Sequence, residues 1–164
     1  MINKIRLLLL TIFTLFWVTS LAITNQELTA ISNSISKNKT STLNADLSNA
    51  YLTKDLEKAM YYAQESLKEA LSNNSLVYIP FAHQQLGKVY LEKGDLLEAL
   101  EQLLIAQEKY TASQNWVEIA FNKILIGGVY AKTGDILRAE NEFNQCQKIG
   151  EKIKNNTLIS TGFL

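Results

Sequence analysis

A period of about 40 residues constrains the fold of this chain more than any other feature. Residues 47–52, 86–91 and 126–131 align, and each segment has a small residue at its second position and Tyr at its fifth. Each is followed by a short turn containing Asp and then by Ala59, Ala99 or Ala139, which are spaced by 40 residues. Such self-similarity indicates a stack of copies of one small motif, in which each copy contacts mainly its neighbours.

The apolar residues within each copy recur at helical spacing. In the second copy they are Leu96, Ala99, Leu100, Leu103, Ala106 and Tyr110. This is the i, i+3, i+4, i+7 stripe of an amphipathic helix, whereas strand-like alternation is nowhere sustained. Asn- and Ser-containing clusters at 73–75, 113–115 and 155–156 separate the stripes. The pattern predicts that each copy is a helix, a tight turn, a second helix and a polar connection.

The glycines have two predicted roles. Gly87 and Gly127 fall in the middle of predicted helices, where Gly costs roughly 1 kcal/mol relative to Ala, so we expect a partner helix to approach them closely. The pairs Gly94-Asp95 and Gly134-Asp135 supply a left-handed residue to end one helix and a carboxylate to cap the next. The first copy keeps the cap at Asp55 without the glycine, so we expect its turn to be tighter and differently angled.

The N-terminus has the layout of a signal peptide. Lys4 and Arg6 precede an uncharged apolar run over residues 7–18, and Ser20 and Ala22 are small residues suited to a peptidase. We expect residues 1–22 to be a signal peptide cleaved after Ala22; an uncleaved membrane anchor and a buried first helix are the alternatives. Whether the leader is cleaved or retained as an anchor, we expect the rest of the chain to be exported to a periplasmic or extracellular location. If the leader is retained, the protein is anchored in the membrane.

Charge and composition exclude several classes of function. The whole chain has 16 Lys and Arg against 16 Asp and Glu, and residues 23–164 have 14 against 16. A strongly basic nucleic-acid-binding surface is therefore not expected. The chain has one Cys and one His, so we expect no disulfide within it, no metal site and no cofactor.

These motifs resemble those of the tetratricopeptide repeat family. The second copy matches through Leu86, Gly87, Tyr90, Gly94, Asp95, Ala99, Leu103 and Ala106, and the third through Ile126, Gly127, Tyr130, Gly134, Asp135, Ala139, Phe143 and Cys146. The resemblance covers roughly residues 41–164, and the 40-residue period is similar to that of long-helix repeats in bacterial regulators and sensor arms. It implies an all-α fold, a right-handed α-solenoid of antiparallel helix-turn-helix repeats.

The resemblance also implies a division of the chain. A leading helix or linker occupies residues 23–40, a divergent first repeat 41–75, the second repeat 76–115 and the third 116–155. Residues 156–164 resemble the start of a further, truncated repeat.

In this family the first helix of each repeat lines a concave groove that binds protein or peptide. The corresponding positions here are Asn49, Phe81, Gln84, Lys88, Leu91, Glu92, Phe121, Ile124 and Lys132. Phe81 and Phe121 either anchor a partner or pack between repeats. The family's clamp for acidic C-terminal tails needs Lys, Asn and Arg, and apart from Asn49 the positions carry Ala45, Gln85, Phe121 and Leu125. A receptor for such tails is therefore not expected.

No catalytic constellation is present. His83 aligns with Lys123 on what we expect to be an exposed helix face, and Cys146 occupies a small core position. We expect an exported module, not an enzyme, whose partner is a protein or peptide. We expect no contact with nucleic acid, and contact with a membrane only through an uncleaved leader or a missing C-terminal part.

The wider context leaves three hypotheses. The first is the N-terminal sensory or scaffold part of a larger membrane-associated bacterial signalling protein, such as a histidine kinase or a helix-turn-helix regulator. The second is a stand-alone secreted or periplasmic scaffold for an envelope assembly. The third is a substrate-presenting array of a larger hydrolase.

Overall fold

A computed structural model of the chain describes residues 39–40, 42–155 and 157–158. Helical residues 42–51 are followed by α2 (Leu56–Ser72), α3 (Tyr78–Lys93), α4 (Leu96–Ala112), α5 (Trp116–Lys132) and α6 (Ile136–Ile153). The described residues contain no strand, and the predicted all-α class is confirmed. The predicted signal peptide, most of segment 23–40 and most of segment 156–164 lie outside the described residues.

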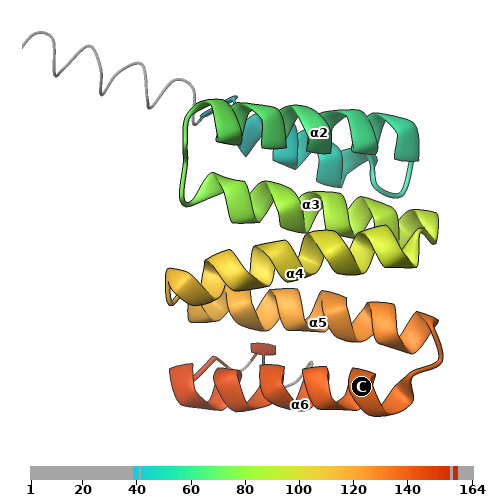
Figure 1. Ribbon diagram of the computed structural model, residues 1–164, viewed down its shortest axis with the longest axis vertical. Coiled ribbons are helices and arrows are strands. Elements are labelled where there is room, and N and C mark those ends of the chain that lie inside the picture. Colours follow the sequence, from blue (N-terminus) through green and yellow to red (C-terminus); the bar gives the residue numbers. More distant parts are fainter. Residues whose placement is uncertain (1–38, 41, 156, 159–164) are drawn as a thin grey trace, which may run out of the picture. The chain divides into compact units, whose positions relative to one another are not determined.

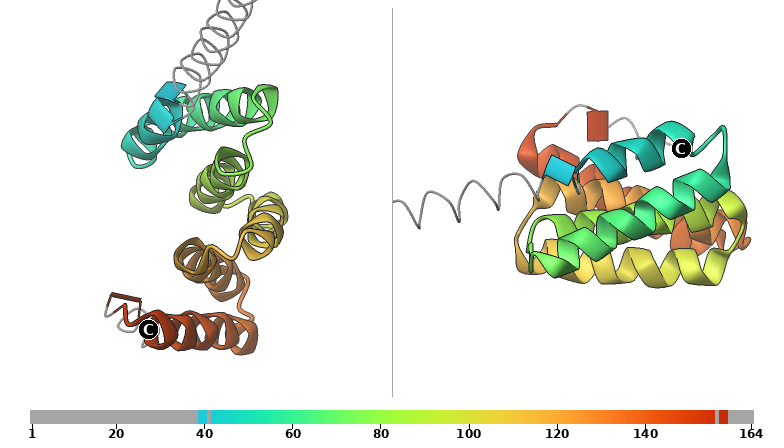
Figure 2. Two further views of the ribbon diagram at one scale, coloured as in Figure 1. Left: turned by 90° about the vertical axis from the view of Figure 1, so that its left-hand side faces the viewer. Right: turned by 90° about the horizontal axis from the view of Figure 1, so that it is seen from above.

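The helices stack in chain order within the unit Asn38–Leu164. Their connections alternate between the two ends of the stack, so consecutive helices are antiparallel (Figure 1). Besides its neighbours α2 and α4, helix α3 also contacts α5, whereas among the described elements α4 contacts neither α2 nor α6. Figure 2 shows α4 displaced to one side of α3 and α5. The first helices of successive pairs therefore form the more closely packed side of the stack.

The mid-helix glycines lie where the second helix of each pair approaches, as predicted. A Cβ at Gly87 would lie 2.6 Å from Leu103 Cγ, and one at Gly127 would lie 2.6 Å from Phe143 Cε1. At the equivalent position of the first pair, the hydroxyl of Ser48 donates a hydrogen bond of 2.9 Å to the carbonyl of Ala59. Side-chain packing thus requires a small residue at Gly87 and Gly127, and Ser48 is held to the second helix of its pair by a hydrogen bond.

The tight turns follow the prediction in part. Gly94 and Gly134 adopt left-handed conformations, with φ of 87° and 81°. The carboxylate of Asp135 accepts a hydrogen bond of 3.0 Å from the backbone N–H of Arg138, as the equivalent Asp55 does from Lys58 at 3.1 Å.

The predicted capping role of Asp95 is wrong. Its side chain makes no capping hydrogen bond to α4. Its carboxylate instead lies 3.5 Å from the ammonium group of Lys93, which precedes the turn glycine. The carboxylate of Asp95 is thus paired with a side-chain cation and makes no hydrogen bond to the first-turn N–H groups of α4.

The connections between pairs repeat a common geometry. Asn74, Gln114 and Lys154 have positive φ values of 48°, 53° and 56°. The N–H of the next residue donates to a carbonyl five residues earlier, from Ser75 to Ala70, Asn115 to Tyr110 and Asn155 to Gly150. This pattern satisfies carbonyl groups at the end of each second helix.

The core follows the helix contacts. One buried cluster joins Leu91, Leu103, Ile126 and Val129 across α3, α4 and α5, and another joins Ala59, Ala63, Leu86 and Val89 across α2 and α3. None of the helices in the described ranges combines the length and the apolar character that crossing a membrane requires.

Candidate functional site

A cavity of about 320 Å³ lies between α3 and α5, on the closely packed side of the stack. It is lined by Asn49, Phe81, Gln84, Gln85, Lys88, Glu118, Phe121, Ile124 and Leu125. Six of these were predicted groove residues: Asn49, Phe81, Gln84, Lys88, Phe121 and Ile124. Residues from three helices, each the first of its pair, therefore meet in one hollow.

The other three predicted groove residues lie elsewhere. Leu91 is 8% exposed and belongs to the core cluster with Ile126 and Val129. Glu92 is exposed and does not line the cavity. Lys132 is also exposed, and its ammonium group donates a hydrogen bond of 3.0 Å to the carbonyl of Leu91.

Three lining residues were not among the predicted groove residues. Gln85 and Leu125 stand at positions that do not complete the family's clamp, and no sequence motif includes Glu118. Glu118 lies in the first turn of α5, where acidic residues are common for their effect on the helix dipole. Its partner Lys88 is 30 residues away in sequence, so no local pattern joins them.

The polar wall of the cavity contains two buried amides. Gln84 is 3% and Gln85 is 1% exposed. The Nε2 atom of each is buried and has no hydrogen-bond partner among the described residues. An unsatisfied buried donor costs about 1–3 kcal/mol, so each of these two amides lowers the stability of the fold as long as no group accepts its hydrogen bond.

Lys88 and Glu118 supply the charges of the cavity. Burial lowers the pKa of Lys88, and the attraction of Glu118 partly opposes that shift. Burial likewise raises the pKa of Glu118, with Lys88 opposing it. The pair makes no direct ion pair among the described contacts. Desolvation therefore outweighs mutual attraction for both groups.

Tyr110, on α4, is a third titratable group close to this pair. Its side chain is 2% exposed and its hydroxyl has no partner among the described residues. Burial raises its pKa, and the negative charge of Glu118 adds to the effect. Tyr110 therefore remains a neutral phenol beside Glu118.

The apolar part of the cavity consists of side chains from both helices. Phe81 is half-buried, whereas Phe121 is 41% exposed although it is a large aromatic residue. Both line the cavity together with Ile124 and Leu125. An aromatic ring left this exposed at a cavity is a typical feature of a binding surface.

Other candidate groups form structural contacts. His83 was expected on an exposed face, but it is half-buried and its Nδ1 lies 2.8 Å from Gln102 Oε1. At the equivalent position Lys123 pairs with Glu142 at 2.9 Å. Cys146 is buried, and the described residues contain no cluster of three or more His, Cys, Asp or Glu side chains suited to a metal ion.

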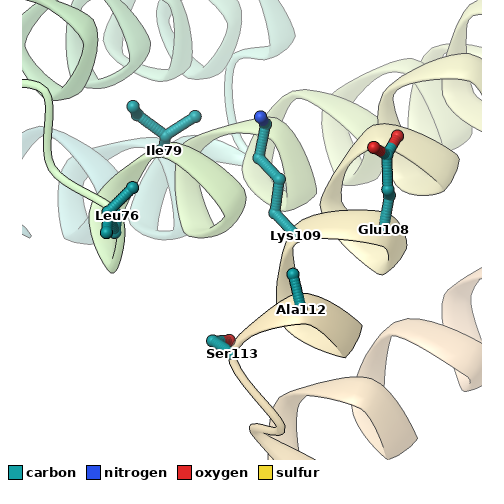
Figure 3. A pocket seen from close by; sticks show the side chains of 6 residues that line it. All are labelled: Leu76, Ile79, Glu108, Lys109, Ala112 and Ser113. Carbon is teal, nitrogen blue, oxygen red and sulfur yellow. The ribbon is translucent and has the colours of Figure 1, made fainter.

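A second cavity, of about 340 Å³, lies where the α2–α3 connection meets the end of α4 (Figure 3). Leu76 and Ile79 line one side, and Glu108, Lys109, Ala112 and Ser113 line the other. Both charged residues are exposed, and no buried polar group without a partner is among the lining residues. It therefore offers less specific chemistry than the cavity between α3 and α5.

Comparison with known proteins gives a similarity of fold. No family model matches the chain, and no curated protein matches it. Its structure is similar to the crystal structure of the apo form of RapI, with a TM-score of 0.65 and 22% sequence identity over 76% of this chain. The chain spans about 35% of the length of that protein. The similarity, together with the stacked helix pairs, supports the predicted α-solenoid of helical repeats.

Proposed function

We propose that this chain is a tetratricopeptide repeat module that binds a protein or peptide in the cavity between α3 and α5, without catalysis of its own. The observation that carries the proposal is the composition of that cavity. Exposed aromatic surface, buried amides without partners and a desolvated charge pair meet there on the first helices of successive pairs. Mixed apolar and polar lining of this kind suits a polypeptide ligand.

The assignment to this repeat family is supported by the positions that the family motif specifies. Gly87 and Gly127 occupy close helix contacts with Leu103 and Phe143, which are themselves motif positions. Ala99 and Ala139 are buried between the helices of their pairs, at 0% and 3% exposure. The motif residues therefore make the contacts that a tetratricopeptide repeat needs.

Selection from a phage-displayed library of random dodecapeptides tests the binding function. Panned against the full chain, the library is expected to enrich peptides that lose binding to the double variant Phe81→Ala/Phe121→Ala. Leu97→Ala is the matched control, because Leu97 is 77% exposed and does not line the cavity. Circular dichroism should show the same helix content for all three proteins. Equal enrichment on the double variant, or no enrichment on the wild type, would contradict the proposal.

A second comparison addresses the polar wall. Replacing Gln84 and Lys88 by Ala should leave helicity intact and weaken the enriched peptides' binding in fluorescence anisotropy. If the peptides bind this variant as tightly as the wild type, Gln84 and Lys88 do not contribute to binding.

We further propose that the module acts outside the cytoplasm, as the sensory or scaffold arm of a membrane-associated signalling protein. This rests on the charged, apolar and small-residue order of residues 1–22 and on the resemblance to long-helix repeats of sensor arms. A fusion of residues 1–40 to alkaline phosphatase, which is active only after export, should be active in bacterial cells. Inactivity of the fusion would contradict export, and Leu9→Arg/Leu10→Arg is the matched negative control.

A further inference from the structure

The first helix pair contains a cluster of three tyrosines. Tyr51 ends helical residues 42–51, and Tyr61 and Tyr62 lie in α2. The rings of Tyr51 and Tyr62 are stacked, with centroids 5.7 Å apart and planes at 13° to each other. The ring of Tyr61 meets that of Tyr62 edge-on, with centroids 5.3 Å apart. The part of the chain that the structure describes has no other contact between aromatic rings.

The repeat pattern does not account for this cluster. Tyr51 occupies the repeated tyrosine position, whereas the positions equivalent to Tyr62 in the second and third pairs are Gln102 and Glu142. Those two side chains make polar contacts with the first helix of their pair, at 2.8 and 2.9 Å. The phenol at residue 62 is therefore an addition to the repeat, and it brings two phenols together across the helices of the first pair.

The cluster leads from the surface toward the interior of the pair. Tyr61 is 58% exposed, whereas Tyr62 and Tyr51 are half-buried. A one-electron oxidant in solution therefore meets Tyr61 first, and the ring contacts allow electrons to move to it from Tyr62 and then from Tyr51.

Two side chains of α2 hold the ring of Tyr51. The ammonium group of Lys58 lies 5.3 Å from the centroid of that ring, an attractive cation–π contact. Tyr62 is four residues further along α2 and so lies on the same face of the helix as Lys58. The Tyr51 ring is therefore fixed beside the ring of Tyr62.

We propose that Tyr51 and Tyr62 are a site of oxidative cross-linking, at which a peroxidase supplied with hydrogen peroxide joins the two rings as dityrosine. Each phenol loses one electron and its hydroxyl proton and becomes a phenoxyl radical. The two radicals form one carbon–carbon bond between ring positions next to the hydroxyl-bearing carbons, and the hydrogens on those positions move to the oxygens. One hydrogen peroxide takes up the two electrons and two protons and is reduced to two water molecules.

The ring geometry favours coupling within one chain. The stacked rings are within the usual distance of an aromatic pair, and the ring torsion of tyrosine is broad, so small rotations bring the reacting carbons together. Two radicals held in one molecule also react without having to meet by diffusion.

The product would join the first helix of the pair covalently to α2. It closes a loop around the turn at Asp55, the turn that lacks a glycine, and restricting the unfolded chain in this way should stabilise the pair. Neither Tyr51 nor Tyr62 lines the cavity between α3 and α5, so the cross-link does not depend on the proposed binding function.

Treatment of the full chain, in dilute solution, with horseradish peroxidase and hydrogen peroxide tests the proposal. The monomer fraction should gain dityrosine fluorescence and melt at a higher temperature than the untreated chain. After digestion with trypsin, mass spectrometry should find segment 40–54 joined to segment 59–68 with the loss of two hydrogen atoms. Fragmentation should place the bond between Tyr51 and Tyr62. A bond from Tyr51 to Tyr61, or dityrosine found only between chains, would overturn the proposal.

Tyr62→Phe keeps the ring and removes the phenol, so it should abolish the linked segments without changing the helix content in circular dichroism. Tyr130→Phe is the matched control and should leave the yield unchanged. Tyr130 is equivalent to Tyr51 and has Arg138 over its ring at 4.8 Å, but it contacts no aromatic ring among the described residues. The same linked segments from Tyr62→Phe would overturn the proposal.

Tyr61→Phe tests the route of oxidation. This variant should form the bond between Tyr51 and Tyr62 several-fold more slowly than the wild type, because its most exposed phenol is missing. An unchanged rate would contradict the entry of oxidation through Tyr61.

Discussion

Leu103 fills the space that a side chain at Gly87 would need. The Cβ position of Gly87 lies 2.6 Å from Leu103 Cγ and 2.7 Å from its Cδ2, and Leu103 is fully buried. Gly87→Ala should therefore lower the melting temperature by several degrees, because overpacking costs about 1–3 kcal/mol and exceeds the helix-propensity gain of about 1 kcal/mol.

Gly128→Ala is the matched comparison for Gly87→Ala. A Cβ at Gly128 meets only Leu91 Cδ2, at 3.7 Å, so this substitution should gain helix propensity and raise the melting temperature. Differential scanning calorimetry measures the change in melting temperature of each variant. A Gly87→Ala protein more stable than the wild type would disprove the close contact.

The connection between α4 and α5 contains a residue in an unfavourable backbone conformation. Gln114 has φ of 53°, which glycine adopts without cost. Gln114→Gly should increase the free energy of unfolding by about 0.5–1 kcal/mol in urea titration. Its neighbour provides the contrast: Asn115→Gly should decrease stability, because the Asn115 side chain accepts a hydrogen bond from the N–H of Glu118. If both variants shift stability in the same direction, the assignment of strain to Gln114 is wrong.

The two turn aspartates that follow glycines should differ in importance. Asp135→Ala removes a capping acceptor from α6, whereas Asp95 makes no such bond to α4, so Asp135→Ala should lower the melting temperature more than Asp95→Ala. The pKa of Asp135 is lowered, first by the backbone N–H of Arg138 and then by its side chain. Its stabilisation is therefore present above the ordinary pKa of 3.8 and is lost as pH falls through the lowered value. Melting curves at pH 7 and below pH 3 should show the difference between the variants shrinking in acid.

The coupling of Lys88 and Glu118 predicts opposite pKa changes in two variants. Lys88→Met removes the attraction that opposes burial, so the already raised pKa of Glu118 should rise further. Glu118→Gln should, by the same reasoning, lower the pKa of Lys88 further. NMR titration of the carboxyl and ε-methylene carbons measures these shifts, and Lys148→Met, at an exposed site outside the cavity, should cause neither.

The Lys88 and Glu118 pair should also affect how the free energy of unfolding depends on pH. Because the folded-state pKa of Glu118 is raised, the free energy of unfolding falls as pH rises through that pKa, and Glu118→Gln should abolish this decrease. A decrease that persists in Glu118→Gln would assign it to another group.

The repeat periodicity predicted the helix contacts because each contact lies within one pair of neighbouring helices. Gly87 against Leu103 and Gly127 against Phe143 are separated by 16 residues each, a spacing that recurs in the sequence. The capping role of Asp95 was wrongly predicted from the shared Gly-Asp motif. The two turns differ beside that motif, because Lys93 pairs with Asp95, whereas Thr133 stands at the equivalent position before Asp135.

The cavity could be predicted only in part. The resemblance to the repeat family placed Phe81, Gln84 and Lys88 in the groove, and they do line the cavity, but it also placed Leu91 there. Leu91 is instead buried in the core cluster with Ile126 and Val129 of α5. The burial of Gln85 and the approach of Glu118 to Lys88 depend on how two helices that are not adjacent in sequence pack, which helix phase does not encode.

The hydrogen bond from Lys132 to the carbonyl of Leu91 joins residues 41 positions apart, across the boundary between two helix pairs. Near the end of α3 that carbonyl accepts hydrogen bonds from the N–H of Gly94 in its own turn, at 3.3 Å, and from the ammonium group in the last turn of α5, so melting of the third pair would remove one of its two donors. The second pair thus depends on the third for part of its own helix termination, and these two pairs are energetically coupled. They should accordingly unfold in one cooperative transition, with fraying of the third pair transmitted to the second.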